Sequence, residues 1–179
     1  MSLPDSLQTI AEVGVALAGF SGLVVALRKK TGPLSEVEKY RLQVLLTLAF
    51  GAVFLSFLPE ILTSLELQTG RAWLYSGFAL CIYSIVFLSW WMKATRNFIH
   101  TFPEIFHWTA FTRMILAHVA VIVLQLSAAF SLIPVSAATA FVIALVWYLI
   151  HSAQQFVRML FVQPNSAISE KTSAEETDH

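Results

Sequence analysis

Two histidines inside long apolar stretches are the residues best suited to chemistry in this chain. His118 and His151 each lie about 16 residues from Pro134. Proline cannot continue a helix, so it predicts a turn, and an antiparallel helical hairpin around that turn puts both histidines at one depth. Gln125 and Gln155 extend the two histidine faces at helical spacing. This polar stripe indicates a structural hydrogen-bond network, a proton or ion relay, or paired axial ligands for a haem.

Two carboxylates are the other candidates for an ion pathway. Glu12 lies in the first apolar stretch, and Glu60 follows Pro59 at the end of the second. A carboxylate in hydrocarbon costs several kcal/mol unless it is paired, protonated or hydrated, so it marks a functional site by default. Two such groups near one face attract cations or share a proton. The alternative is that both lie in the headgroup region and are simply solvated.

The first apolar stretch also carries small residues at three- and four-residue spacing. They are Ala11, Gly14, Ala18 and Gly22, with Ser21 beside the last. In lipid, small residues let helix backbones approach closely, and this close packing is a main source of attraction between helices. The stripe predicts packing against the chain's own spans or, alternatively, against a neighbouring copy with this helix at a symmetric centre.

The composition requires these residues to be positioned by membrane-spanning helices. Of the 179 residues, 57% are hydrophobic and 12% are charged, against roughly a quarter charged in an ordinary soluble domain, and mean hydropathy is +0.71. We expect an all-α polytopic membrane protein of about five transmembrane helices, with a tight hairpin of the last two at Pro134. The uncharged stretches are Val13–Leu27, Leu42–Pro59, Ala72–Met92 and Met114–Val157, the last divided into roughly 114–133 and 136–158.

Charged and capping residues set the boundaries and the orientation. Ser35 and Glu38 have capping-box spacing and predict a helix start. All Lys and Arg residues except Arg71 fall on one side of the predicted spans. The positive-inside rule therefore places the C-terminus in the cytoplasm and the N-terminus outside, without a cleaved signal peptide. We expect one transmembrane domain, residues 1–163, and a disordered cytoplasmic tail, residues 164–179.

Several functional classes are disfavoured. The formal net charge is zero, so there is no basic excess to attract nucleic acid. The single cysteine, Cys81, forms no intrachain disulfide, and no Cys/His pattern predicts a metal site. Phosphate-binding loops, hydrolase motifs and zinc-protease motifs are absent from the sequence. We therefore expect no catalytic residues, no enzyme activity and no required cofactor.

The segment Ile10–Gly22, the run Tyr40–Leu46 and the run Phe54–Pro59 together resemble a group of small bacterial integral membrane proteins. Members of this group open with an AGFxG helix and a basic loop, and the similarity covers about the first third of the chain. The resemblance implies a bacterial inner-membrane protein and carries no established activity. The first helix also has a looser similarity to that of Orai-type calcium channels, although Glu12 precedes Gly19-Phe20 here, so the helix would run the opposite way.

Three functional hypotheses follow. The first is a small homo-oligomeric channel or transport subunit in the lipid bilayer, with the first helix near the oligomer axis and Glu12 at the outer mouth for a cation. The second is a non-conducting structural or partner-binding membrane protein. The third is a b-type haem electron carrier that uses His118 and His151.

Overall fold

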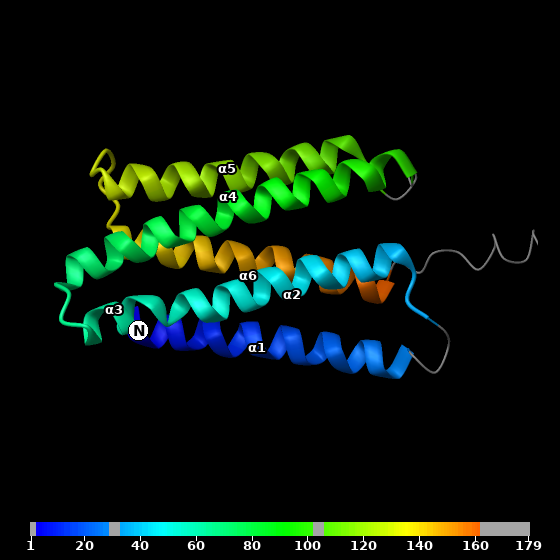
Figure 1. Ribbon diagram of the computed structural model, residues 1–179, viewed down its shortest axis with the longest axis horizontal. Helices are drawn as coiled ribbons and strands as arrows, with labels where there is room; N and C mark the ends of the chain where they lie inside the picture. The colour runs from blue at the N-terminus through cyan, green and yellow to red at the C-terminus, as the bar shows by residue number, and fades with distance from the viewer. Residues whose placement is uncertain (1–2, 29–32, 102–105, 162–179) are drawn as a thin grey trace, which may run out of the picture.

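The apolar stretches fold into helices because only an internally hydrogen-bonded backbone is stable in hydrocarbon. The computed structural model describes residues 3–28, 33–101 and 106–161, and this part of the chain is all-helical (Figure 1). Five segments are long and apolar enough to cross a membrane, with α2 and α3 together forming the second. The protein is thus an all-α polytopic membrane protein. Its helices are α1 (Leu3–Arg28), α2 (Glu36–Ser56), α3 (Leu58–Ser64), α4 (Thr69–Thr101), α5 (Trp108–Ala129) and α6 (Ala137–Phe161).

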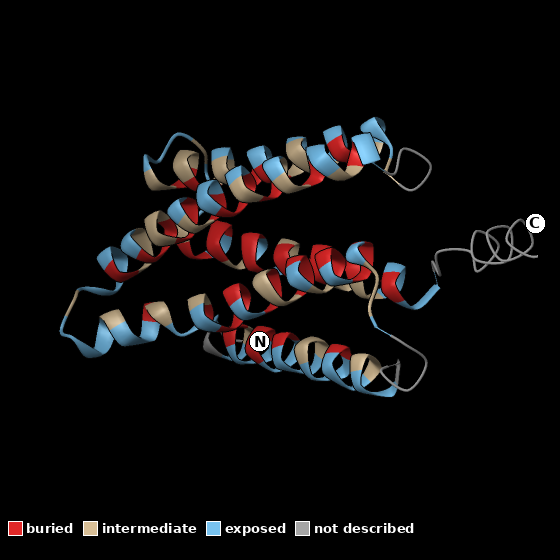
Figure 2. Cartoon of the chain, turned by 45° about the vertical axis from the view of Figure 1, so that its right-hand side comes forward, coloured by how far each residue is buried: buried red, intermediate tan, exposed pale blue. Residues whose placement is uncertain are grey.

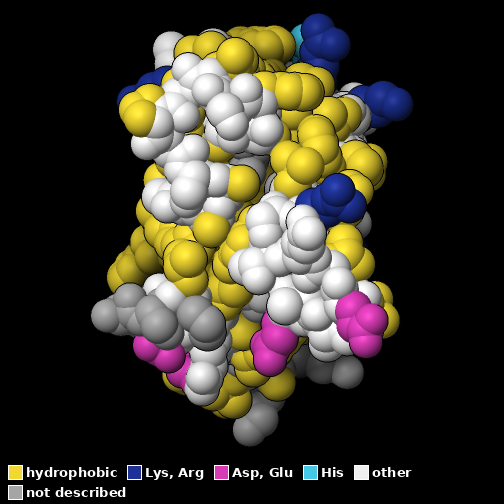
Figure 3. Space-filling model, turned by 90° about the vertical axis from the view of Figure 1, so that its left-hand side faces the viewer, with side chains coloured by type: hydrophobic (Ala, Val, Ile, Leu, Met, Phe, Trp, Pro, Cys, Tyr) yellow, Lys and Arg dark blue, Asp and Glu magenta, His cyan; other side chains and the backbone are white. Residues whose placement is uncertain are grey.

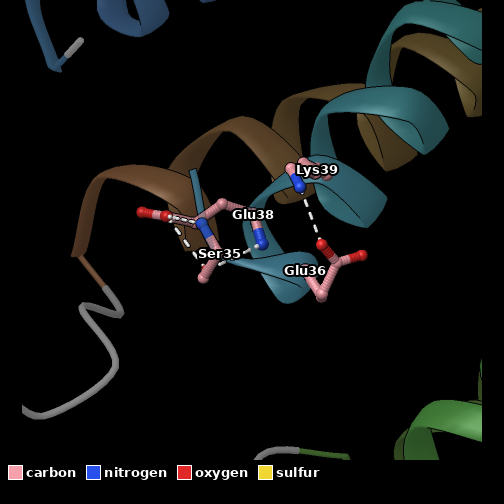
Figure 4. A network of polar contacts seen from close by, with 4 residues as sticks. All are labelled: Ser35, Glu36, Glu38 and Lys39. Atoms are coloured by element: carbon pink, nitrogen blue, oxygen red, sulfur yellow. Dashed lines mark hydrogen bonds and ion pairs between the residues drawn. The ribbon is translucent and has the colours of Figure 1, made fainter. Parts of the chain in front are cut away.

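The predicted start of the second span is confirmed in atomic detail (Figure 4). The Ser35 hydroxyl accepts from the Glu38 backbone N–H at 3.3 Å, and the Glu38 carboxylate accepts from the Ser35 backbone N–H at 3.0 Å. This capping box satisfies two donors that a helix N-terminus otherwise leaves unpaired. Lys39 and Glu36 form an exposed ion pair of 2.7 Å in the same first turn.

The helix limits differ from the sequence expectation in two places. The first helix begins at Leu3, ten residues before the uncharged stretch, because polar residues at a membrane boundary continue a helix readily. The second span is divided at Phe57, as the helix-breaking effect of Pro59 leads one to expect. The final hairpin turn is longer than predicted: α5 ends at Ala129, Ser131 has a left-handed backbone with φ 54°, and α6 begins after Pro134 at Ala137. The predicted tail, residues 164–179, lies outside the described residues.

The last helix occupies the centre of the bundle. Helix α6 packs against α1, α2, α4 and α5, whereas α1 packs only against α2 and α6 among the described helices. Helices α1 and α5 therefore lie on opposite sides of α6 (Figure 1). Figure 2 shows the buried residues on the helix faces turned toward this centre. The exposed helix faces are largely apolar, as lipid contact requires.

The two ends of the bundle differ in charge. We call one the basic end, which carries Lys39, Arg41, Lys93, Arg96, Arg113 and Arg158 together with Glu36 and Glu38. The opposite, acidic end carries Asp5, Glu60 and Glu66 together with Arg71. Figure 3 looks onto the acidic end and shows the acidic side chains gathered toward the side formed by α1 and α3. This separation agrees with the asymmetry of basic residues in the sequence.

The small residues of α1 do not all lie on one packed face. Ala11 and Gly14 are buried, Ala18 is half-buried, and Gly22 is exposed. A Cβ at Gly14 would lie 2.6 Å from Val53 Cγ2 and 3.0 Å from the Ala49 carbonyl oxygen, so α2 occupies this stripe. Ser21 takes the buried position near the other end, and the next residue, Gly22, is turned away by ~100°.

This close approach predicts a position-dependent effect of adding one methyl group to α1. Gly14→Ala should lower the free energy of unfolding by about 1–3 kcal/mol, because the backbone of α2 must move to make space. Gly19→Ala is the matched control, since nothing lies within 4 Å of a Cβ there, and it should leave stability unchanged or raised. Thermal unfolding in mild detergent measures both. Equal stabilities would show that α1 and α2 do not pack in this way.

Candidate functional site

The structure brings His118 and His151 into contact, as their spacing around Pro134 predicts. Their ring centroids lie 5.1 Å apart with an interplanar angle of 72°. The exposed fractions are 1% for His118 on α5 and 0% for His151 on α6. The next turn of α6 holds the His151 ring in place, because Gln155 Nε2 lies 3.0 Å from His151 Nε2. Three of the predicted pathway residues thus form one buried cluster.

Aromatic side chains enclose this pair. Phe87 and Trp91 of α4 stack on the His118 ring at centroid distances of 5.5 and 6.0 Å. Trp147 meets the same ring edge-on at 5.7 Å. The enclosure excludes lipid from the imidazoles and fixes both ring planes, so that their hydrogen-bonding atoms have defined directions.

The hydrogen bonds assign complementary tautomers to the two neutral rings. His118 Nδ1 lies 3.0 Å from the Met114 carbonyl oxygen, which can only accept, so Nδ1 carries the proton and Nε2 is an acceptor. His151 Nε2 accepts from the Gln155 amide nitrogen, so its Nδ1 is a donor. His118 Nε2 and His151 Nδ1 are both buried without a hydrogen-bond partner among the described residues. Each unpaired atom costs about 1–3 kcal/mol, and the pair is suited to sharing a proton or a small polar guest.

The pair does not fit a haem between the two rings. Axial ligation would require two metal–nitrogen bonds of ~2.0 Å and a macrocycle between the imidazoles. Here the rings contact each other in a T-shape at 5.1 Å, and Phe87 and Trp91 occupy the adjoining space. In the described part of the chain, no group of three or more His, Cys, Asp or Glu side chains could hold a metal ion.

Further polar contacts continue along the bundle interior. The Tyr148 hydroxyl forms a hydrogen bond with Ser84 of α4. Ser152 donates to the Leu45 carbonyl oxygen of α2 at 3.1 Å. Gln125 lies two turns further along α5, on the same face as His118, and is 3% exposed. The predicted polar stripe therefore faces protein rather than lipid, as hydrogen bonding requires.

The two acidic candidates lie away from the histidine pair, toward the acidic end of the bundle. Glu12 is exposed on α1, and its Oε1 accepts a hydrogen bond of 2.9 Å from Gln8 Nε2. Gln8 lines a cavity of about 640 Å³, which we call the acidic-end cavity. Asp5 and Glu60 line it too, together with Thr63, Thr69 and Trp73. Glu12 and Glu60 do not contact each other directly. Gln8 links them, because it donates to Glu12 and lines the same cavity as Glu60.

Sequence reasoning missed two parts of this arrangement. Asp5 and Gln8 were not recognised as neighbours of the acidic candidates, although the four-residue spacing of Gln8 and Glu12 places them on one helix face. Tyr40 and Arg41 entered the sequence analysis only through the family resemblance and, for Arg41, the orientation by basic residues. Both are buried at the basic end, where the Tyr40 hydroxyl meets Thr95 of α4. No local sequence signal indicates that contact, because 55 residues separate the partners.

No protein-family model, curated protein or solved structure matches this chain. The geometry described above is therefore the basis for assigning a function.

The contact between the histidines predicts that their substitutions are energetically coupled. His118→Leu and His151→Leu should deviate from additivity in unfolding free energy by ~0.5–3 kcal/mol, because each changes the surroundings of the other ring. His100, exposed near the end of α4, provides the control: His118→Leu and His100→Leu should be additive. Thermal unfolding of the single and double variants gives the coupling. Additivity in both pairs would mean that the two buried rings do not interact.

Proposed function

We propose that the protein is a homo-oligomeric membrane protein that conducts a cation, with α1 at the contact between copies. The observation that carries this proposal is Glu12, an exposed carboxylate within a membrane span, joined through Gln8 to the acidic-end cavity. The competing function is a non-conducting scaffold in which the same residues only specify packing.

The depth of Glu12 supports this function. It follows Asp5, the first residue of the candidate span, by seven residues, or about 10 Å at 1.5 Å per residue. A single protomer would expose this carboxylate to hydrocarbon, at a cost of several kcal/mol. A neighbouring copy or a hydrated pathway between copies removes that cost. The Gln8 amide alone supplies one hydrogen bond and no opposite charge.

Glycines on the same face support assembly. Ala16, Gly19 and Gly22 are exposed on α1, and Gly19 lies two turns from Glu12 in line along the helix. Within the protomer nothing lies within 4 Å of a Cβ at Gly19 or Gly22. A glycine in a helix interior costs up to about 1 kcal/mol relative to alanine, and no contact inside the protomer accounts for that cost. Close approach of a second helix does account for it.

The charge at the acidic end favours a cation. Asp5 and Glu60 line the acidic-end cavity, and no lysine or arginine of the described residues does. Carboxylates around a low-dielectric opening raise the local concentration of cations by factors of ~10 or more. The sequence asymmetry further supports an orientation with the acidic end outside and the basic end in the cytoplasm. A bacterial inner membrane is the location that the resemblance of the first third implies.

Assembly is tested by enlarging the exposed glycine. Gly19→Leu should shift the oligomer to smaller species in mild detergent, because the added side chain separates two closely packed backbones. Gly70→Leu is the matched control, since Gly70 also faces open space but lies on α4. Size-exclusion chromatography with light scattering measures the mass. An unchanged mass for Gly19→Leu would show that α1 does not lie at the interface between copies.

Conduction is tested by removing the charge of Glu12 while keeping its shape. Glu12→Gln should leave the oligomer intact and reduce cation flux into liposomes about tenfold, because the charge that concentrates the ion is lost. Glu66→Gln removes an exposed carboxylate at the same end that does not line the acidic-end cavity, and flux should stay within twofold. If wild-type liposomes carry no flux, or Glu12→Gln leaves it unchanged, the scaffold function replaces conduction.

A further inference from the structure

A second cavity lies at the basic end, on the side of the histidine pair away from the acidic end. It has a volume of about 300 Å³, and α2, α4, α5 and α6 contribute to its lining. We call it the basic-end cavity. Its polar lining includes Tyr40, Arg41, Thr95, Gln155 and Arg158. Because Gln155 also bonds His151, this cavity reaches the edge of the buried histidine cluster.

Arg41 is a buried cation, and the described residues accept only one hydrogen bond from its guanidinium group. It is 4% exposed, and its Nη1 donates to the Arg158 carbonyl oxygen at 3.0 Å. Its guanidinium carbon lies 6.0 Å from the Phe106 ring centroid. A guanidinium has five N–H donors, and the Arg158 carbonyl oxygen is the one acceptor that the described residues supply to them. Burying a cation in this way is costly unless an anion completes its coordination.

The charged groups around this cavity favour the binding of an anion. Arg41 and Arg158 are close enough to repel one another electrostatically, and Arg158 is exposed at the mouth. No carboxylate of the described residues lines the cavity. Glu38 acts electrostatically on Arg41, but its carboxylate is held by the Ser35 cap. An oxyanion between the two guanidinium groups would relieve the repulsion and accept hydrogen bonds from both.

Apart from His107, the rest of the lining is apolar, which distinguishes this cavity from a site for a small soluble anion. Ile99, Phe106, Ala110, Phe111 and Met114 form the walls beside the two arginines. Charged groups on one side and apolar groups on the other match a phosphate joined to the start of an acyl chain. The cavity also lies where headgroups would be, at the end of the bundle that carries Lys93, Arg96 and Arg113.

We propose that the basic-end cavity binds the phosphate headgroup of one anionic phospholipid, held by Arg41 and Arg158. The two guanidinium groups contact the phosphate oxygens, and the apolar wall of α4 and α5 contacts the glycerol and the first acyl carbons. A zwitterionic headgroup is disfavoured, because its ammonium group would approach two cations. This proposal does not depend on conduction, since the cavity and Glu12 lie at opposite ends of the molecule.

The experiment uses the full-length protein in detergent and native mass spectrometry. Phosphatidylglycerol and phosphatidylcholine with identical acyl chains are titrated separately. We expect one phosphatidylglycerol per protomer to bind at least tenfold more tightly than phosphatidylcholine. Arg158→Gln should weaken phosphatidylglycerol binding about tenfold, since it removes a charge-assisted contact from an exposed position and spares the fold. Arg41→Gln should have an effect of the same size. If the Arg41→Gln variant does not fold, the result for Arg158→Gln alone tests the site.

Arg113→Gln is the matched control. Arg113 is an exposed arginine at the same end, on α5, and it does not line the cavity. Phosphatidylglycerol affinity should stay within twofold in this variant. An equal loss in Arg113→Gln and Arg158→Gln would reveal diffuse attraction to the basic end and overturn the site. Displacement of the lipid by millimolar inorganic phosphate would identify a soluble anion as the ligand and overturn the lipid assignment.

Discussion

Polar side chains in a membrane-spanning helix need partners from other helices, because hydrocarbon offers them no hydrogen bonds. This constraint explains why α6 lies at the centre. Its polar residues face three neighbours: Tyr148 bonds Ser84 of α4, Ser152 bonds the α2 backbone, and His151 contacts His118 of α5. Placing α6 anywhere else would expose this stripe to lipid. The remaining helices are arranged around that requirement, and α1, which has few buried polar groups, lies on the outside of α2 and α6.

Among the places where the described residues satisfy this constraint incompletely, two are of different kinds. At the histidine pair, an acceptor and a donor are sealed among aromatic rings with no partner in the described residues. At Glu12, a carboxylate lies on the surface of a membrane span. The missing hydrogen-bond partners of the histidine pair are internal, and a shared proton or a small bound molecule can supply them. The deficit at Glu12 is external and can be met only by another molecule or by water. This difference is why the oligomer proposal rests on Glu12 and not on the histidines.

The two ends of the bundle present opposite chemistry to their surroundings. The acidic-end cavity combines carboxylates and hydroxyls at α1 and α3, which suits a cation. The basic-end cavity combines two guanidinium groups with apolar walls, which suits an anion attached to an acyl chain. Both cavities lie where the helices separate toward the ends of the spans. There, polar residues near the helix ends meet from segments distant in sequence, such as Tyr40 and Thr95.

Much of the architecture could be predicted from the sequence, because hydropathy and charge act locally. A run of uncharged apolar residues has to form a helix in lipid, proline has to interrupt it, and Ser35 with Glu38 has to cap its neighbour. The level pairing of His118 and His151 was predictable for the same reason, since a hairpin relates equal distances from Pro134. Which residues of α1 face its neighbours was not: Gly14 is packed against α2, whereas Ser21 takes the buried position near the other end and Gly22 is turned away from it. The two cavities depend on helices separated by more than fifty residues, so only the tertiary structure brings Arg41 to Arg158 and Gln8 to Glu60.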